Sequence, residues 1–288
     1  MKSSLCRLGG ITAAVALALG AATFPGKTAR TERFTGLKHA PIQVHRHSDG
    51  TLKRGPLNQM VSGNWSGYVV AHYQTGQTYL SAQGTWIVPS VSYFPGFSEE
   101  YSASWVGIGG FCKNALCFTA DHTLIQLGTS QNVSSSGTGY SAWYEMIPNP
   151  PVQIKISVSP GDIITASLEC MAACSSSKQS WKLTMTNVTQ NVSWSGTFKY
   201  ASSRLSAEWI EEAPSSAGGV LPLANYGPYP NPAPFDPGSP SLSSSDGIVM
   251  EDPWGQTSNP SAPDSDTDGF STCWGSGTSL TPCYPPNS

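Results

Sequence analysis

The sequence predicts an all-β fold, in the form of an antiparallel β-sandwich or jelly roll. From Asn64 onward, short runs of β-branched and aromatic residues alternate with clusters of Gly, Pro, Asn and Ser. The 288 residues include 29 Gly and 23 Pro, which makes long helices hard to place. Charged residues make up only 11% of the chain, against roughly a quarter in average soluble proteins. This composition argues against charge-driven disorder, a coiled coil and nucleic-acid binding.

Ten segments carry a clear strand signal and three later ones a weaker signal, with no sign of a second domain. Pro148, Pro150 and Pro151 predict a sharp corner between two strands. Residues 226–245 are rich in Pro and Ser and are expected to form a long surface loop. The expected strands are Trp65–Tyr73, Tyr79–Val88, Tyr101–Ile108, Thr123–Gly128, Tyr140–Ile147, Val152–Val158, Ile163–Glu169, Ser180–Asn187, Val192–Tyr200 and Ser206–Glu212, then Val220–Asn225, Gly247–Glu251 and Gly269–Trp274.

The first residues have the pattern of a secretory signal peptide. Lys2 and Arg7 precede an apolar run over residues 11–22, which ends in small residues. The run is too short to span a bilayer. We therefore expect a signal peptide over residues 1–22, a secreted protein and no membrane partner.

The segment after the signal peptide is basic, whereas the rest of the chain is acidic. Residues 1–54 hold nine Lys and Arg against two acids, and residues 55–288 hold six against 16. Residues 23–60 are therefore expected to form a basic, largely irregular propeptide, with a disordered linker as the alternative. Such a segment would dock on the acidic domain, act as an intramolecular inhibitor and detach when acid protonates the carboxylates. The remaining expected boundaries are a processing site at Lys53-Arg54, a β-sandwich domain over 61–275 and a C-terminal tail over 276–288.

Six cysteines lie outside the expected signal peptide and fall into three close pairs. In an oxidising compartment such pairs favour disulfides over a zinc site. Six cysteines allow fifteen pairings, so local pairing is the preferred interpretation rather than a necessary one. The three local pairs are Cys112 with Cys117, Cys170 with Cys174, and Cys273 with Cys283.

Several hydrolase motifs are absent from the sequence. It contains no Gly-x-Ser-x-Gly elbow, no His-Glu-x-x-His helix, and no Asp-Thr-Gly or Asp-Ser-Gly. Asp264, Asp266 and Asp268 are spaced as in a calcium loop, but Gly275 stands where that loop needs Glu. We expect a turn there, with no bound metal and no cofactor anywhere in the chain.

A few acids and amides occur inside expected strands. Alternation places Trp143 and Glu145 on one face of their strand, and Glu208 and Glu212 on one face of another. Gln126 stands between two apolar residues. Buried polar groups need partners and often lie in functional clefts. The alternative is that each side chain points to solvent from a half-exposed sheet.

Seven short segments stand in the order in which one peptidase family has them. They are Asn64-Trp-Ser-Gly-Tyr68, Gly84-Thr-Trp-Ile-Val-Pro89, Trp105-Val-Gly-Ile108, Ile125-Gln-Leu-Gly128, Ala142-Trp-Tyr-Glu145, Ser159-Pro-Gly-Asp162 and Ala207-Glu-Trp-Ile-Glu211. Through them the chain resembles the glutamic peptidases, or eqolisins, which are secreted acid endopeptidases. The resemblance implies a two-sheet, concanavalin A-like (lectin-like) sandwich with its active site on the concave sheet. It also implies protein or peptide substrates, a signal peptide and a propeptide.

The resemblance also assigns site residues. It implies Gln126 and Glu208 as the catalytic pair, with Trp105, Trp143 and Glu145 lining or bracing the substrate-binding cleft. An ionised Glu208 would take a proton from water as the water attacks the carbonyl, and Gln126 would stabilise the oxyanion.

The sequence departs from the family pattern at two positions. Ser141 and Gly109 stand where the family commonly has aspartate, which affects the acidic support of the site and the pH optimum. Two rival functions fit the same sandwich. One is a glycoside hydrolase that uses Glu145 and Glu208, and the other is a carbohydrate-binding module. We expect a monomer.

Overall fold

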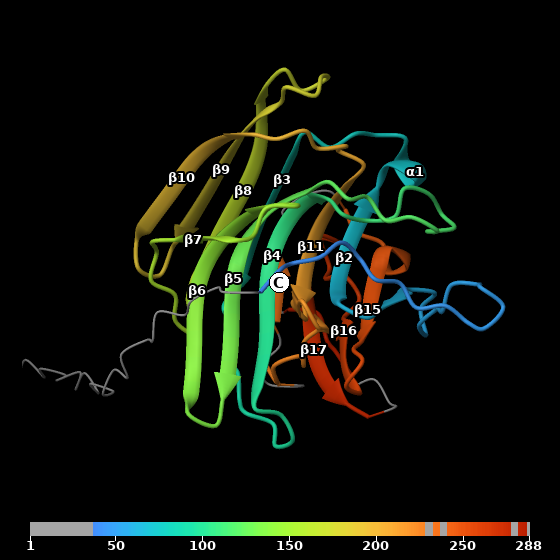
Figure 1. Ribbon diagram of the computed structural model, residues 1–288, viewed down its shortest axis with the longest axis vertical. Helices are drawn as coiled ribbons and strands as arrows, with labels where there is room; N and C mark the ends of the chain where they lie inside the picture. The colour runs from blue at the N-terminus through green and yellow to red at the C-terminus, as the bar shows by residue number, and fades with distance from the viewer. Residues whose placement is uncertain (1–36, 228–232, 237–240, 278–281, 287–288) are drawn as a thin grey trace, which may run out of the picture.

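The computed structural model describes residues 37–227, 233–236, 241–277 and 282–286 (Figure 1). The expected signal peptide and residues 23–36 lie outside this part. The described chain is nearly all β-strand, with one short helix, α1 (His72–Thr75), and one 3₁₀ turn, η1 (Ser244–Asp246). None of the described helices is long and apolar enough to cross a membrane.

Fifteen strands of the described residues form one continuous sheet that folds over into two layers (Figure 1). The front layer has the order β7-β6-β5-β4-β11-β2, and each pair in it is antiparallel. Its strands are β2 (Trp65–Ala71), β4 (Glu99–Gly109), β5 (Leu124–Ser134), β6 (Gly137–Met146), β7 (Val152–Ile154) and β11 (Ser206–Glu212).

The rear layer has the order β10-β9-β8-β3, and a curled run of shorter strands joins it to the front layer. The rear strands are β3 (Ser81–Ile87), β8 (Ile163–Ala172), β9 (Ser180–Asn187) and β10 (Val192–Lys199). The joining strands are β14 (Ala233–Asp236), β15 (Gly247–Glu251), β16 (Gln256–Pro260) and β17 (Phe270–Ser276), with β1 (Met60–Ser62) beside β15. A separate hairpin consists of β12 (Ser215–Ser216) and β13 (Gly219–Val220).

The main hydrophobic core lies between the two layers. Alternation along β4 and β5 turns residues such as Ile108 and Leu127 inward, where they share this core with Leu168 and Leu183 of the rear layer. Trp86 of β3 belongs to the same core, and its indole N–H donates to Thr129 Oγ1 of the front layer at 3.0 Å. The architecture confirms the predicted antiparallel β-sandwich.

A second apolar cluster covers the opposite face of the front layer. Residues 37–59 form isolated β-bridges but no longer strand, and they cross in front of β4, β11 and β2 as the blue segment of Figure 1. Ile42 of this segment is buried and belongs to the cluster, together with Trp105 and Leu124 of the sheet. We call residues 37–59 the covering segment.

Two sequence predictions about the later part of the chain are wrong. The strand expected over Val220–Asn225 is reduced to the end of β13 and single bridges at Leu223 and Asn225. The surface loop expected over residues 226–245 contains strand β14. Phe235 of β14 is buried against Phe270, with ring centroids 5.1 Å apart, which draws this segment into the sheet.

The structure confirms the three predicted disulfides. Cys112 bonds to Cys117, Cys170 to Cys174 and Cys273 to Cys283. The predicted corner after β6 is also present, with a turn before β7.

Candidate active site

Strand register brings the two predicted catalytic residues onto one row of the front layer. Glu208 of β11 pairs with Gly107 of β4, which pairs with Gln126 of β5, which pairs with Glu145 of β6. Because neighbouring strands lie about 4.8 Å apart, the backbones at Gln126 and Glu208 are roughly 10 Å apart. Gly107 between them has no side chain, which leaves this space to the amide and the carboxyl.

Gly107 is required by its surroundings. A Cβ at this position would lie 2.8 Å from the Trp105 ring and 3.3 Å from Gln126 Cβ. A similar constraint holds in the next row, where Gly128 lies between Trp105 and Trp143. A Cβ on Gly128 would lie 2.4 Å from Ser104 O. Glycines on the inner strands therefore make room for the large and polar side chains of their neighbours.

The same face carries all five residues that the sequence analysis assigned to the site. Gln126, Glu208, Trp105 and Trp143 are fully buried, and Glu145 is 1% exposed. Gln126 Nε2 donates to Glu145 Oε2 at 2.8 Å. Hence this carboxylate fixes the direction of the Gln126 amide.

Glu208 is held by two donors, one side-chain hydroxyl and one backbone N–H. Ser206 Oγ donates to Glu208 Oε1 at 2.5 Å, and the backbone N–H of Gly109 donates to the same carboxyl group. The other carboxyl oxygen, Oε2, and the amide oxygen of Gln126 are buried without a hydrogen-bond partner among the described residues. Each catalytic candidate thus keeps one acceptor atom that is not engaged in holding the side chain.

Burial changes the protonation of both acids in this row. Burial raises the pKa of Glu145 to about 7, although the nearby His39 opposes the shift. Burial also raises the pKa of Glu208 well above its ordinary value, and the charge of Asp121 adds to the effect. In the described state, both carboxyl groups therefore hold a proton in acid solution.

The covering segment makes direct contact with this site. The imidazole of His39 stacks on Trp143, with ring centroids 3.7 Å apart and an interplanar angle of 9°. His39 Nδ1 lies 2.9 Å from Glu212 Oε2, and Ala40 N donates to Glu212 Oε1 at 3.0 Å. The backbone of His39 also bonds to Glu145. The segment therefore spans the face from β6 to β11.

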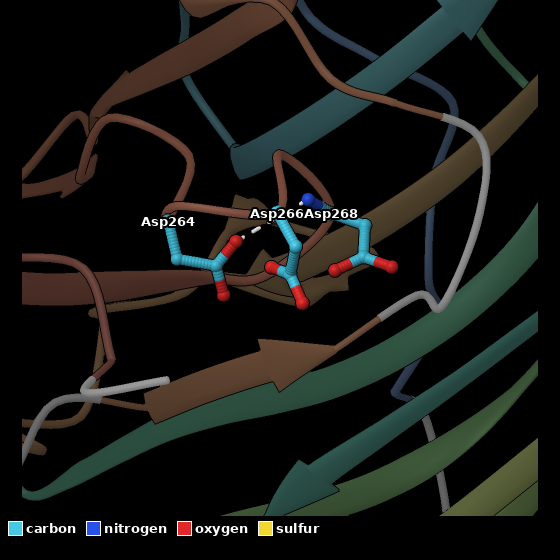
Figure 2. A group of neighbouring side chains, drawn as sticks. All are labelled: Asp264, Asp266 and Asp268. Carbon is cyan, nitrogen blue, oxygen red and sulfur yellow. Dashed lines mark hydrogen bonds between the residues drawn. The ribbon is translucent and has the colours of Figure 1, made fainter.

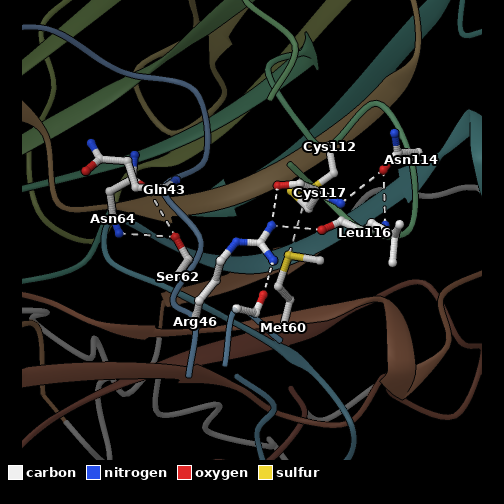
Figure 3. The surroundings of a disulfide bond; sticks show 10 residues. Gln43, Arg46, Met60, Ser62, Asn64, Cys112, Asn114, Leu116 and Cys117 are labelled. Carbon is white, nitrogen blue, oxygen red and sulfur yellow. Dashed lines mark hydrogen bonds between the residues drawn. A yellow bond between two sulfur atoms is a disulfide. The ribbon is translucent and has the colours of Figure 1, made fainter. Parts of the chain in front are cut away.

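Further along, the covering segment is fastened to the first disulfide loop (Figure 3). The Arg46 guanidinium donates to Leu116 O at 2.8 Å and to Cys117 O at 2.6 Å. It also lies 4.9 Å from the centre of the Phe118 ring. Lys53 forms an ion pair with Glu251 at 2.5 Å. Charged contacts at two places thus hold the segment against the domain.

The sequence profile of the Peptidase A4 family matches residues 63–230, more than half of the chain and the part that forms this site. The chain belongs to the Peptidase A4 family. Membership of this family makes it a glutamic-type endopeptidase, which confirms the predicted family and class of enzyme. No curated protein sequence matched the chain significantly.

The chain is similar to solved structures of glutamic peptidases. One is scytalido-glutamic peptidase with a transition-state analogue inhibitor, at 23% identity and a TM-score of 0.50, covering 74% of this chain and 98% of that one. Another is aspergilloglutamic peptidase from Aspergillus niger, at 22% identity and a TM-score of 0.44, covering 61% of this chain and 99% of that one.

The structure adds site residues that sequence analysis did not assign. Alternation placed Glu212 on the face of Glu208, but nothing in the sequence indicated its role in holding the covering segment. His39 and Arg46 gave no signal beyond the basic character of their segment, because their contacts are with residues more than 60 positions away. His39, Arg46 and their partners come together only when this glutamic peptidase has folded.

The two departures from the family pattern have structural consequences. Gly109 has φ +90°, and a Cβ there would lie 1.9 Å from Thr123 O, so this backbone admits no side chain. Ser141 lies on the active-site face in the row of Glu212, and its hydroxyl has no hydrogen-bond partner among the described residues. Neither position supplies an acid to the site.

The calcium-like aspartates form part of the turn before β17 (Figure 2). Carboxylate oxygens of Asp264, Asp266 and Asp268 lie within 4.8 Å of one another. Asp264 Oδ1 accepts the backbone N–H groups of Asp268 at 3.3 Å and Gly269 at 3.0 Å. Through these bonds Asp264 stabilises the turn that the sequence analysis expected here.

Glu211 lies next to the active site in sequence but points the opposite way, into the sandwich. It is fully buried, and Ser104 Oγ donates to its Oε2 at 2.6 Å. Burial raises the pKa of Glu211 to about 7. Its neutral form is therefore the one that suits the fold.

We expect the peptidase to lose stability as pH rises toward neutral. A carboxyl group with a folded pKa of about 7 and an ordinary value of 4.5 stabilises the fold fully below pH 4.5, and this contribution is lost as pH rises to about 7. For Glu211 the loss is on the order of 3 kcal/mol. Urea unfolding between pH 4 and 7.5 should show this decline, and Glu211→Gln should make it shallower, because Glu145 and Glu208 still contribute.

Glu169→Gln, at an exposed position, is the matched control and should leave the pH dependence unchanged. An equally steep decline in Glu211→Gln and in the unaltered protein would contradict the assignment to Glu211.

Proposed function

We propose that this peptidase hydrolyses peptide bonds of protein substrates at acid pH, with Glu208 as general base and Gln126 as oxyanion donor. The observation that carries the proposal is the row in which Gly107 separates these two side chains. The family membership supports the class of reaction, and the register supports the pair. No observation favours the glycosidase or carbohydrate-binding alternative.

The two groups have complementary chemistry. Water is a poor nucleophile. An ionised Glu208 therefore takes a proton from the water molecule while the water oxygen attacks the carbonyl carbon of the substrate. Negative charge then develops on the carbonyl oxygen, and one N–H of the Gln126 amide donates to it while the other stays with Glu145. The protonated Glu208 finally gives its proton to the leaving amine. The acceptor oxygens that now lack partners, Glu208 Oε2 and Gln126 Oε1, suit the binding of one water molecule.

Trp105, Trp143 and Glu145 form the floor around this pair and are proposed to contact the substrate. Trp143 offers a flat indole face, which His39 covers in the described state. Trp105 is fixed in place because its Nε1 donates to Glu212 Oε2 at 2.9 Å. Rigid aromatic groups of this kind lose little conformational freedom when a peptide binds.

The covering segment is proposed to be the described part of an inhibitory propeptide that extends over residues 23–60. It lies on the face that carries both catalytic candidates, which are fully buried, and it contacts Glu145 and Glu212 through backbone N–H groups, as an extended peptide would. The same burial favours the neutral form of Glu208, which cannot act as a base. Removal of the segment would admit water and substrate together.

Secretion and cleavage of a signal peptide over residues 1–22 are part of the proposal. The three disulfides support an oxidising compartment. The low charge content of 11% also suits an acidic medium, because it limits self-repulsion when the carboxylates are neutral.

Glu208→Gln should abolish proteolysis at acid pH, because the amide cannot accept the proton of water at the step that makes the nucleophile. Hydrolysis of acid-denatured casein measures the loss, and circular dichroism checks that the fold is kept. Glu169→Gln should hydrolyse casein at the rate of the unaltered protein. Near-normal turnover by Glu208→Gln would refute the role of the carboxylate.

Gln126→Ala should lower kcat by about 10²–10³, the typical effect of losing one oxyanion donor. KM should change much less, because the interaction strengthens in the transition state. Kinetics on a short fluorogenic peptide separate the two constants. A rise in KM with unchanged kcat would make Gln126 a binding residue instead.

Arg46→Ala should shorten the lag before activity appears when the full chain is acidified. The substitution removes two hydrogen bonds and a ring contact that fasten the covering segment. Lys113→Ala, an exposed position next to Cys112, is the control and should keep the lag. Mass spectrometry of the N-terminus follows the cleavage. Full activity in an uncleaved chain would contradict the inhibitory role.

A further inference from the structure

A second acid, Asp121, lies beside the proposed catalytic base. It belongs to the segment between the first disulfide loop and β5, and only 2% of it is exposed. Its Oδ2 lies 3.2 Å from the point where a Cβ on Gly109 would stand. The backbone N–H of the same Gly109 donates to Glu208. One glycine thus separates the two carboxyl groups.

Asp121 is held firmly by groups that fix its direction. Its Oδ1 accepts Thr123 N and Thr123 Oγ1, both at 3.0 Å. Its Oδ2 accepts a hydrogen bond from Ser203 Oγ. Ser203 also donates its backbone N–H to Thr123 Oγ1 at 2.9 Å and lies three residues before β11. The carboxylate therefore ties the start of β5 to the entry of the strand that carries Glu208.

Within the part of the chain that the structure describes, few other ionisable groups face Glu208. Tyr79, before β3, interacts with it electrostatically. Glu145 of β6 lies in the same row, but Gln126 stands between them and donates to Glu145. Asp121 is the charged neighbour whose negative charge opposes ionisation of Glu208. Like charges in a buried site disfavour each other's ionised form.

We propose that Asp121 is a positioning residue that holds Glu208 in place and sets the pH at which Glu208 gives up its proton. It acts in two ways, through the Ser203 bond that anchors the entry of β11 and through its charge beside Gly109. The inference rests on the proposed role of Glu208 as general base. Asp121 lies outside the row of catalytic candidates, yet it would influence the pH range in which Glu208 is active.

The charge can be removed with little change of shape by Asp121→Asn. The amide oxygen can accept the two Thr123 bonds, and the amide N–H₂ can donate to Ser203 Oγ, whose hydroxyl is able to accept. Without the negative charge Glu208 ionises more readily. We expect the acid limb of the kcat/KM profile to move to lower pH by roughly half a unit or more, with KM changed less than about threefold.

Asp162→Asn is the matched control. Asp162 is also buried, at 5% exposure, and its Oδ2 accepts Ser159 N at 2.9 Å and Asn187 Nδ2 at 2.7 Å. It belongs to a turn before β8, so its substitution should leave the acid limb where it is even if the fold is weakened. A purely structural role for Asp121 would likewise lower activity without moving the limb.

Thr123→Val gives a second measurement if Asp121→Asn does not fold. It removes the hydroxyl donor that holds the Asp121 carboxylate beside Gly109 and so loosens the position of this negative charge. The acid limb should move in the same direction by a smaller amount. Acid limbs that coincide with that of the unaltered enzyme in every folded variant would overturn the inference. Absence of acid proteolysis in the unaltered enzyme, or activity in Glu208→Gln, would instead overturn the proposed function.

Discussion

The alignment of four strands through Gly107 is the constraint on which the site depends. Antiparallel pairing sets Glu208, Gly107, Gln126 and Glu145 in one row, and a shift of any strand by one residue would turn its side chain into the core. The register is secured because the alternate positions of the same strands, such as Ile108 and Leu127, fill the main core. Catalytic geometry and core packing are thus fixed by one alignment.

The front layer is unusual in being covered on both faces. Its inner face packs on the rear layer, and its outer face packs under residues 37–59. Burial of Glu145, Glu208 and Glu211 follows from this arrangement, and each of these acids has a raised pKa. A protein that buries three carboxyl groups in neutral form is matched to acid solution by its fold. Its sparse surface charge points the same way.

Much of the fold and site could be predicted from the sequence, because the decisive signals are local. Alternation gave the faces of β6 and β11, and the strands Ser180–Asn187, Ser206–Glu212 and Gly247–Glu251 have the predicted bounds. The segment around Gln126 was recognisable by its neighbours in the chain. The catalytic roles themselves stay predictions that rest on resemblance and register.

What the sequence did not reveal depends on contacts between distant segments. Strand β14 forms because Phe235 packs against Phe270. The local sequence, which is rich in Pro and Ser, has no pattern that predicts this contact. His39 meets Glu212 across 173 positions, and Asp121 meets Ser203 across 82. Such pairs carry no periodicity, and their residue types are common in loops. Their roles emerge only when the chain has folded.

The apolar cluster beneath the covering segment bears on how reversible the fold is. Ile42 buries its side chain in this cluster, so a domain cut free of residues 37–59 presents aromatic surface to water that the full chain keeps dry. The shortened domain gains less free energy on folding, by about 25 cal/mol for each Å² of apolar surface left uncovered. Its equilibrium stability is therefore lower than that of the full chain. A denatured domain without the segment thus has less free energy to drive it back to the folded state than the full chain has.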